Sequence, residues 1–336
     1  MIFLYLIFII IFIIGIQFTK KEFNDNYLSK ETTTIINGFF VITIFFSHFI
    51  TYINDINKYD QLLINIMSYI GQLMVTSFLF YSGFGIYESI KKKENYIKAF
   101  FKKRFIPTFV NFVVAVLLFL IINIIMGNNY PIKTILLSFI GYESIGNSNW
   151  YMLAIFSLYI FIMICFNSKI KIKNIYRIIT LTFLVVIYIY VISRYKDNYY
   201  VDTILCFPVG MFYSYFKDKI DNIFKKKYYL WYIIIFLLFI LMYYFSKHFA
   251  NVGSYNIFAI SFIILIVIST MKFKFNNKTM TFLGVHTFWI YILQRIPMII
   301  LQNKLDKYIY FICSLLITIV LSYIMNKLMN KLWKRG

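Results

Sequence analysis

A single histidine, His48, lies inside an apolar run that covers residues 35–53, a length and hydropathy that suit a membrane helix. A charged side chain at mid-bilayer costs about 2.5–3.5 kcal/mol, and a neutral imidazole still needs a polar partner there. A neutral imidazole can take a proton from a hydroxyl and return it to a leaving group. His48 is therefore the first candidate for a general base. The alternative is a structural histidine, bonded to a backbone carbonyl, a tyrosine or a serine.

Other polar residues share the helical face of His48. At about 100° per residue, Asn37 lies within about 20° of His48 around the helix axis. Thr34, Thr51 and Tyr52 fall on the same side. Together they form a broken polar stripe, so we expect Asn37 to face a cavity.

Three basic residues, Lys102, Lys103 and Arg104, stand just before Pro107, a residue that suits the first turn of the next span. A cluster at this place can bind phosphate groups. It can also simply mark the cytoplasmic end of a helix. The residues alone leave both interpretations open.

Two further helices carry isolated polar groups. Ser82 stands beside two glycines, a pattern more typical of close helix packing than of chemistry. Thr287, Tyr291 and Gln294 share one helical face, and Arg295 follows near the predicted outer interface. Arg295 can extend to lipid headgroups, or it can contact an anion or a sugar in an outward cavity.

The composition indicates an all-α integral membrane protein, because 61% of the residues are hydrophobic and 14% are charged. The first run has no basic residues before it and no cleavage pattern after it, so we expect a retained span. About eleven runs are long enough to cross a bilayer. These cover residues 2–18, 35–53, 62–87, 107–126, 150–166, 175–193, 201–216, 228–245, 255–271, 282–301 and 308–325.

The net charge of +21 follows the predicted topology. With the N-terminus outside, most of the 34 lysine and arginine residues fall in inner segments, which predicts a cytoplasmic C-terminus. The inner segments are 20–30, 91–104, 169–177, 217–227, 272–278 and 327–335. This distribution explains the charge by topology and by attraction to anionic membrane lipids, so we expect no nucleic-acid partner.

The sequence predicts one polytopic bundle of about 10–11 helices, since no soluble insertion or fixed repeat interrupts the spans. We expect residues 1–34 to be an added N-terminal helix with a cytoplasmic loop, and residues 35–336 to form a body of about ten helices. The three cysteines stand in apolar runs without metal-ligand spacing, which predicts neither a disulfide nor a metal site.

Several segments, taken in order, resemble the acyltransferase family 3 membrane proteins, which include O-acetylases of surface polysaccharides. The resemblance covers about residues 35–326, and each motif is weak by itself. The similar segments are NGFFVITIFFSHF (37–49), FLFYSGFGIYES (78–89), FKKRFIP (101–107), NWYMLAIFSLY (149–159), FPVGMFYSYF and FLGVHTFWIYILQ. The chain departs from the family at Asn37, where arginine is frequent, at Gln294, where histidine is frequent, and in the basic motif, where a second arginine is usual.

The resemblance implies transfer of an acyl group, expected to be acetyl from acetyl-CoA, to a hydroxyl of an extracytoplasmic cell-surface glycan. His48 is then the general base, and the basic cluster binds the acyl-CoA, which is a co-substrate and not a bound cofactor. The residues expected to line the cavity or contact the acceptor are Asn37, Ser82, Trp150, Tyr291, Gln294 and Arg295. A bacterial plasma membrane is the expected location.

Two other functions stay open from the sequence. A transporter or glycan exporter also lines its path with polar stripes, but it would favour paired carboxylates and broken helices in two matched halves. A noncatalytic membrane subunit is the third possibility, favoured by the departures at Asn37 and Gln294.

Overall fold

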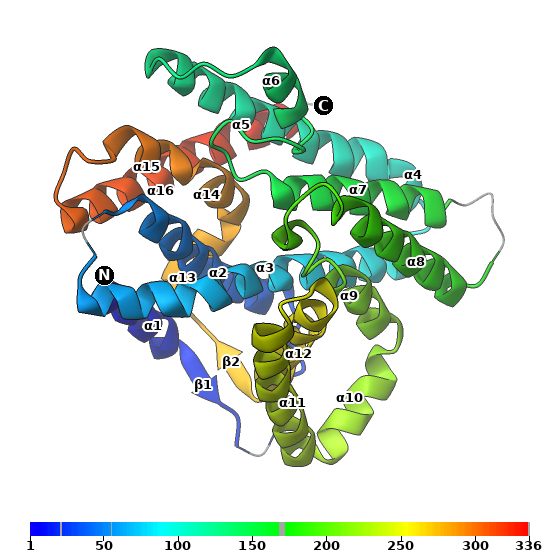
Figure 1. Cartoon of the computed structure of the whole chain (residues 1–336). Helices are drawn as coiled ribbons and strands as arrows, with labels where there is room; N and C mark the ends of the chain where they lie inside the picture. The colour runs from blue at the N-terminus through cyan, green and yellow to red at the C-terminus, as the bar shows by residue number, and fades with distance from the viewer. Residues whose placement is uncertain (21, 55, 168–171, 335–336) are drawn as a thin grey trace.

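The computed structural model describes residues 1–20, 22–54, 56–167 and 172–334. These residues fold almost entirely into helices that are arranged side by side (Figure 1). The helices are α1 (Ile2–Ile14), α2 (Lys30–Phe49), η1 (Ile50–Tyr52), α3 (Lys58–Lys92), α4 (Tyr96–Phe100), η2 (Phe101–Phe105), α5 (Ile106–Ile125), α6 (Ile132–Ser138), α7 (Trp150–Cys165), α8 (Asn174–Ile192), η3 (Asn198–Tyr200), α9 (Cys206–Tyr215), α10 (Lys217–Lys226), α11 (Tyr228–Phe249), α12 (Val252–Thr270), α13 (Lys278–Val285), α14 (Thr287–Leu293), α15 (Arg295–Leu301) and α16 (Lys307–Lys334). The strands are β1 (Ile16–Phe18) and β2 (Phe273–Phe275), which pair antiparallel.

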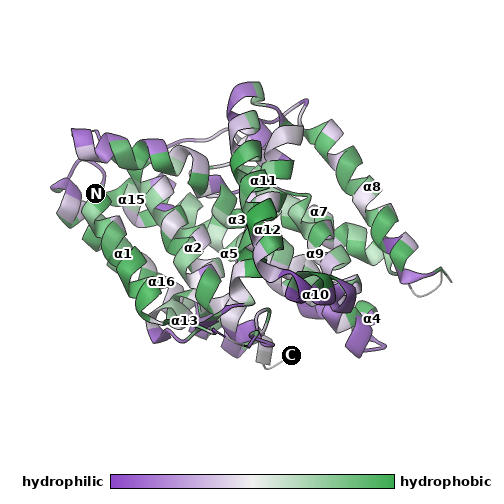
Figure 2. Cartoon of the chain, turned by 90° about the horizontal axis from the view of Figure 1, so that it is seen from below, coloured by the Kyte–Doolittle hydropathy of each residue, from purple (hydrophilic) through white to green (hydrophobic). Residues whose placement is uncertain are grey.

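The structure confirms an all-α polytopic membrane protein. Among the described residues, 7 helices are long and apolar enough to cross a bilayer, or up to 8 if one bent pair forms a span. Figure 2 shows a band of hydrophobic residues between hydrophilic margins, the pattern that a bilayer requires. The spanning helices are α2, α3, the continuous helix Tyr96–Ile125, α8, α11, α12 and α16.

Among the described residues, fewer helices are long enough to cross a bilayer than the sequence predicts, because several apolar runs form shorter or bent helices. The first run, predicted over residues 2–18, ends as α1 at Ile14 and continues as β1. The side chain of Asn277 donates to the carbonyl of Ile11 at 2.6 Å, and a Cβ at Gly15 would lie 2.3 Å from the carbonyl oxygen of Asn276. This contact favours the turn from helix to strand. The run predicted over residues 150–166 forms α7, which has 16 residues and is shorter than the roughly 20 that a span needs.

The run predicted over residues 201–216 contains a helix, α9, of only 10 residues. Asn256 of α12 bonds to the preceding irregular segment at two points: its amide donates to the carbonyl of Val201 at 3.0 Å, and its oxygen accepts from the N–H of Leu205 at 3.2 Å. Irregular backbone at membrane depth needs partners of this kind.

The run predicted over residues 282–301 is bent by 65° after Val285. His286 stands at the bend, and its Nδ1 hydrogen-bonds to the carbonyl oxygen of Phe282 at 2.7 Å. The side chain is 8% exposed and packs between the rings of Phe282 and Tyr323.

Glycines bring two pairs of helices into close backbone contact. A Cβ at Gly83 of α3 would lie 2.1 Å from the carbonyl oxygen of Phe207 in α9, and one at Gly210 would lie 2.2 Å from that of Phe80. On α2, a Cβ at Gly38 would lie 2.0 Å from the carbonyl oxygen of Met280 in α13. These contacts fix α9 and α13 against α3 and α2.

The basic segments lie at one end of the spanning helices, where α2 begins at Lys30 and α3 ends at Lys92. This arrangement follows from the alternating directions of α2 and α3. Four basic residues of the predicted inner segments, Lys21, Lys169, Lys171 and Arg335, lie outside the described residues. We refer to this end as the basic end of the molecule.

Candidate functional site

The structure brings four of the predicted site residues into one cavity of about 370 Å³ in the middle of the bundle. Asn37 from α2, Ser82 from α3, Arg104 from η2 and Tyr291 from α14 all line it. Segments that are far apart in the sequence therefore meet here. The whole lining comprises Asn37, Phe78, Tyr81, Ser82, Arg104, Tyr151, Tyr159, Gly284, Val285, Thr287, Phe288 and Tyr291. We call this the middle cavity.

Several polar groups of the middle cavity have no partner in the protein. The hydroxyl oxygens of Tyr81, Ser82 and Tyr291 are buried and make no hydrogen bond within the described chain. Buried polar groups are normally satisfied, and an exception at a cavity points to water or a ligand. Asn37 is held in place because its Oδ1 accepts from the hydroxyl of Ser77 at 3.1 Å.

A second cavity, of about 580 Å³, opens at the basic end of the molecule. Four basic side chains, from Lys30, Lys92, Arg104 and Lys217, and two acidic side chains line it. Tyr81 and Arg104 belong to both linings, so this inner cavity adjoins the middle cavity. Its excess of positive charge suits an anionic ligand.

The predicted basic cluster is divided by the structure. Arg104 faces the inner and middle cavities, where its guanidinium interacts with the phenol of Tyr159. Lys102 and Lys103 are exposed elsewhere on the π-helical turn η2. A π-helical turn shifts the register of side chains around the axis, and such turns are frequent at functional sites.

Lys217 is oriented by a polar network at the inner cavity. Its ammonium donates to Asp221 Oδ2 at 2.5 Å and lies 4.9 Å from the ring centre of Tyr27. The phenol of Tyr27 also donates to Asp221 and contacts the hydroxyl of Tyr213 at 3.2 Å. Burial raises the pKa of Tyr27, which keeps this phenol a neutral donor. The network fixes a cation at the mouth of the cavity.

His48 lies in the last turn of α2, at the end opposite to Lys30, and is half-buried. Its backbone carbonyl accepts from Thr51 Oγ1 at 2.7 Å, whereas no hydrogen bond to the imidazole is present in the described part of the chain. The partner that the structural alternative requires is therefore missing there. The guanidinium of Arg295 is close enough to act electrostatically on the imidazole.

Gln294 and Arg295 form the junction between α14 and α15. Gln294 is fully buried and donates to the carbonyl of Tyr291 at 2.9 Å, and its Oε1 has no partner among the described residues. The charge of Arg295 also acts on Tyr291 of the middle cavity. Gln294 and Arg295 are next to the lining residue Tyr291, whereas His48 is not among the residues that line the middle cavity.

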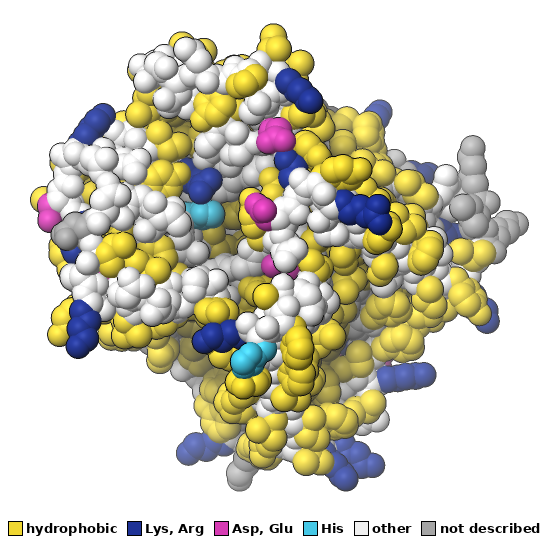
Figure 3. Space-filling view, viewed as in Figure 1, with side chains coloured by type: hydrophobic (Ala, Val, Ile, Leu, Met, Phe, Trp, Pro, Cys, Tyr) yellow, Lys and Arg dark blue, Asp and Glu magenta, His cyan; other side chains and the backbone are white. Residues whose placement is uncertain are grey.

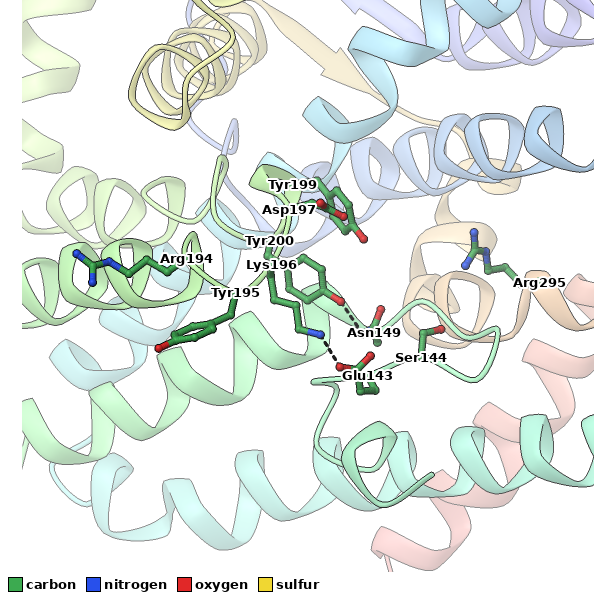
Figure 4. Close-up of a pocket in the computed structure, with 10 residues that line it drawn as sticks. All are labelled: Glu143, Ser144, Asn149, Arg194, Tyr195, Lys196, Asp197, Tyr199, Tyr200 and Arg295. Carbon is green, nitrogen blue, oxygen red and sulfur yellow. Dashed lines mark hydrogen bonds and ion pairs between the residues drawn. The ribbon is translucent and has the colours of Figure 1, made fainter. Parts of the chain in front are cut away.

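A third cavity, of about 640 Å³, lies on the face opposite to the basic end (Figure 4). Its lining consists of Glu143, Ser144, Asn149, Arg194, Tyr195, Lys196, Asp197, Tyr199, Tyr200 and Arg295. Lys196 pairs with Glu143 at 2.8 Å, and the amide of Asn149 donates to the hydroxyl of Tyr200 at 2.8 Å. Figure 3 shows that this face is hollowed, with basic, acidic and histidine side chains around the hollow. We call this the outer cavity.

Trp150 lies between the middle and outer cavities. It is the first residue of α7, and its ring centre is 6.1 Å from that of Tyr151 and 6.4 Å from that of Tyr199. Tyr151 lines the middle cavity, and Tyr199 lines the outer cavity. Trp150 thus contacts one residue of each lining and belongs to neither lining itself.

Sequence reasoning missed three of the four tyrosines of the middle cavity and three lysines of the inner cavity. Tyr81, Tyr151 and Tyr159 are three of 30 tyrosines, so residue type gave no signal. Lys30, Lys92 and Lys217 were counted only as markers of topology, because their convergence depends on tertiary structure. Among the described residues, no group of three or more His, Cys, Asp or Glu side chains is arranged to hold a metal ion.

The fold and the cavities define a polytopic helical membrane protein with polar spaces at both faces and in the middle of the bundle. Residues 34–327 match the acyltransferase domain of acyltransferase family 3, and the chain belongs to this family. No curated protein and no solved structure matches it. The chain is therefore a multi-pass membrane acyltransferase by family, which disfavours the transporter alternative.

Proposed function

We propose that the protein transfers an acyl group, expected to be acetyl, from a cytoplasmic acyl-CoA to a hydroxyl of an extracytoplasmic cell-surface glycan. We propose the bacterial plasma membrane as its location, because the donor is cytoplasmic and the acceptor is extracytoplasmic. The observation that carries the proposal is the series of three cavities, in which Tyr81 and Arg104 join the inner to the middle space. Donor and acceptor then approach from opposite faces, and only the acyl group passes between them.

The inner cavity is suited to the phosphate groups of the donor. Lys30, Lys92, Lys217 and Arg104 converge there, and the Asp221 network holds Lys217 in position. Charge-assisted hydrogen bonds from lysine and arginine to phosphate are short and strong. The pantetheine arm of the donor then extends past Arg104, which places the thioester in the middle cavity.

His48 acts as the general base in this proposal. The imidazole takes the proton of the acceptor hydroxyl while the oxygen attacks the thioester carbonyl. The carbon–sulfur bond then breaks, and the thiolate of CoA recovers a proton from the imidazolium. The sum of these steps gives an ester and a free thiol, so atoms and charges balance.

The unpartnered hydroxyls of Tyr81, Ser82 and Tyr291 support the same proposal. A hydroxyl that is aimed at a reacting thioester can donate to the oxygen on which negative charge develops. Asn37 is on the same lining, and its amide is oriented by Ser77. An amide donor can serve this purpose where the family frequently has arginine.

Mass spectrometry of cell-envelope glycans tests the proposal. The gene is deleted, and the strain is complemented with the wild-type protein or with His48→Ala. We expect the wild-type protein to restore an O-acyl ester and the variant not to restore it at equal abundance in the membrane. Identical glycan spectra for the deletion strain and the wild-type strain would exclude this function.

A further inference from the structure

Arg295 is a cation at the wall of the outer cavity. One guanidinium nitrogen donates to the carbonyl oxygen of Gly146 at 3.5 Å, which is the limit for a hydrogen bond. Its guanidinium lies 5.8 Å from the ring centre of Tyr52. Its Nε is buried without a hydrogen-bond partner, and among the described residues no carboxylate forms an ion pair with it.

The other charged residues of the outer cavity make contacts of their own, and Asp197 keeps its negative charge but forms no ion pair with Arg295 in the described part of the chain. Lys196 pairs with Glu143 at 2.8 Å, and the side chain of Asp197 bonds to Tyr199. The guanidinium of Arg194 lies 4.2 Å from the ring centre of Tyr190 and points away from the cavity centre in Figure 4. The positive charge of Arg295 is thus left for a ligand.

Partial burial of a charge without a counter-ion costs free energy. Buried charges in proteins are therefore normally paired. The cost is larger here because His48 lies within electrostatic reach of Arg295. When His48 takes the proton of an acceptor, two positive charges face one another in a low-dielectric region. A negative group on the acceptor would offset both costs at once.

We propose that the outer cavity binds an acceptor saccharide that carries a carboxylate or phosphate group, and that Arg295 pairs with this group. A guanidinium matches the oxygens of either group with two parallel hydrogen bonds, which also fixes orientation. Two exposed tyrosines of the lining, Tyr195 and Tyr199, offer aromatic faces to the sugar ring. The pairing would place a neighbouring hydroxyl of the sugar toward His48. This inference names the acceptor class of the proposed function and rests on it.

Calorimetric titration of the full-length protein in lipid nanodiscs tests the acceptor class without any acyl transfer. The probes are glucuronate, glucose 1-phosphate and, as the neutral reference, glucose. We expect at least one anionic sugar to bind about tenfold or more tightly than glucose, because a charge-assisted pair contributes about 1.5–3 kcal/mol. The comparison of glucuronate with glucose 1-phosphate identifies the group that is preferred.

Variants assign the effect to the proposed residue. Arg295→Gln should remove the preference for anionic sugars, and Arg295→Lys should retain part of it. Lys133→Gln is the matched control, because Lys133 is exposed on α6 and its loss removes the same charge from the same side. Equal binding of glucose and both anionic sugars, no binding of any probe, or a preference that survives Arg295→Gln would overturn the inference. None of these results depends on the acyl donor, so they separate this inference from the proposed transfer reaction.

Discussion

His48 is the residue on which the chemistry of the account depends, and its role gives the first prediction. Because a general base contributes about 10²–10⁴-fold to rate, His48→Ala should lower kcat by about that factor. The fold should persist, since the imidazole makes no hydrogen bond within the described chain. Acyl transfer by the purified protein measures the effect, and thermal unfolding checks the fold. His248→Ala, at an exposed histidine, is the control. Full activity in a folded His48→Ala protein would contradict the mechanism.

Arg104 gives the second prediction, because the structure separates it from its two lysine neighbours. Arg104→Gln should raise the KM for acyl-CoA about tenfold or more with a smaller change in kcat, since a charge-assisted contact to the donor is lost. Lys103→Gln should leave both constants near their wild-type values, because Lys103 is exposed outside the cavity lining. Steady-state kinetics with varied acyl-CoA decide the point. A comparable rise in KM for Lys103→Gln would favour a donor site on the whole basic cluster, as the sequence suggested.

The polar side chains of the site could be found from sequence where residue type was unusual for a membrane helix. His48, Asn37 and Arg295 stand out because polar groups in apolar runs are rare. Tyr81 and Lys217 do not stand out, because tyrosine and lysine are abundant throughout the chain. Their positions depend on the packing of α3, α9 and α10, which no local pattern specifies.

The close packing of α3 on α9 gives a prediction about stability and not about catalysis. Gly83→Ala would place a methyl group 2.1 Å from the carbonyl oxygen of Phe207, so the helices must separate. We expect a destabilisation of about 1–3 kcal/mol, which is typical of overpacking. Thermal unfolding in detergent measures it. Gly85→Ala, two residues further along α3, is the matched control.

The control variant should be neutral or slightly stabilising. Among the described residues, no atom lies within 4 Å of a Cβ at Gly85, and alanine favours a helix over glycine by about 1 kcal/mol. Equal melting temperatures for Gly83→Ala and wild type would show that the backbone contact between α3 and α9 is not close.

Hydropathy alone located the seven long helices of the described residues, but it also predicted runs that form shorter or bent helices. Residues 2–18, 201–216 and 282–301 are as apolar as true spans, yet each is interrupted by a specific polar contact. Asn277 and Asn256 supply side-chain partners from distant helices, and His286 stands at a bend. A window of hydropathy averages over such single contacts and therefore cannot detect them. The division into residues 1–34 and 35–336 stays a prediction.

The orientation of the whole molecule in the membrane gives a further prediction. The distribution of basic residues places Lys93 inside and Lys133 outside. Both side chains are exposed, so a cysteine at either position can react. In intact cells, with the half-buried Cys313 replaced by serine, an impermeant thiol reagent should label Lys133→Cys and not Lys93→Cys. The reverse pattern would invert the topology, and with it the assignment of the inner and outer cavities.

The central claim is that donor and acceptor react across the bilayer through the three cavities. Sealed proteoliposomes test it directly, with protein of one determined orientation and the envelope glycan enclosed on the side of Lys133. Radiolabelled acetyl-CoA is added on the side of Lys93. We expect labelled ester on the enclosed glycan, with the CoA remaining where it was added. Ester formation only when acetyl-CoA is enclosed together with the glycan would contradict it.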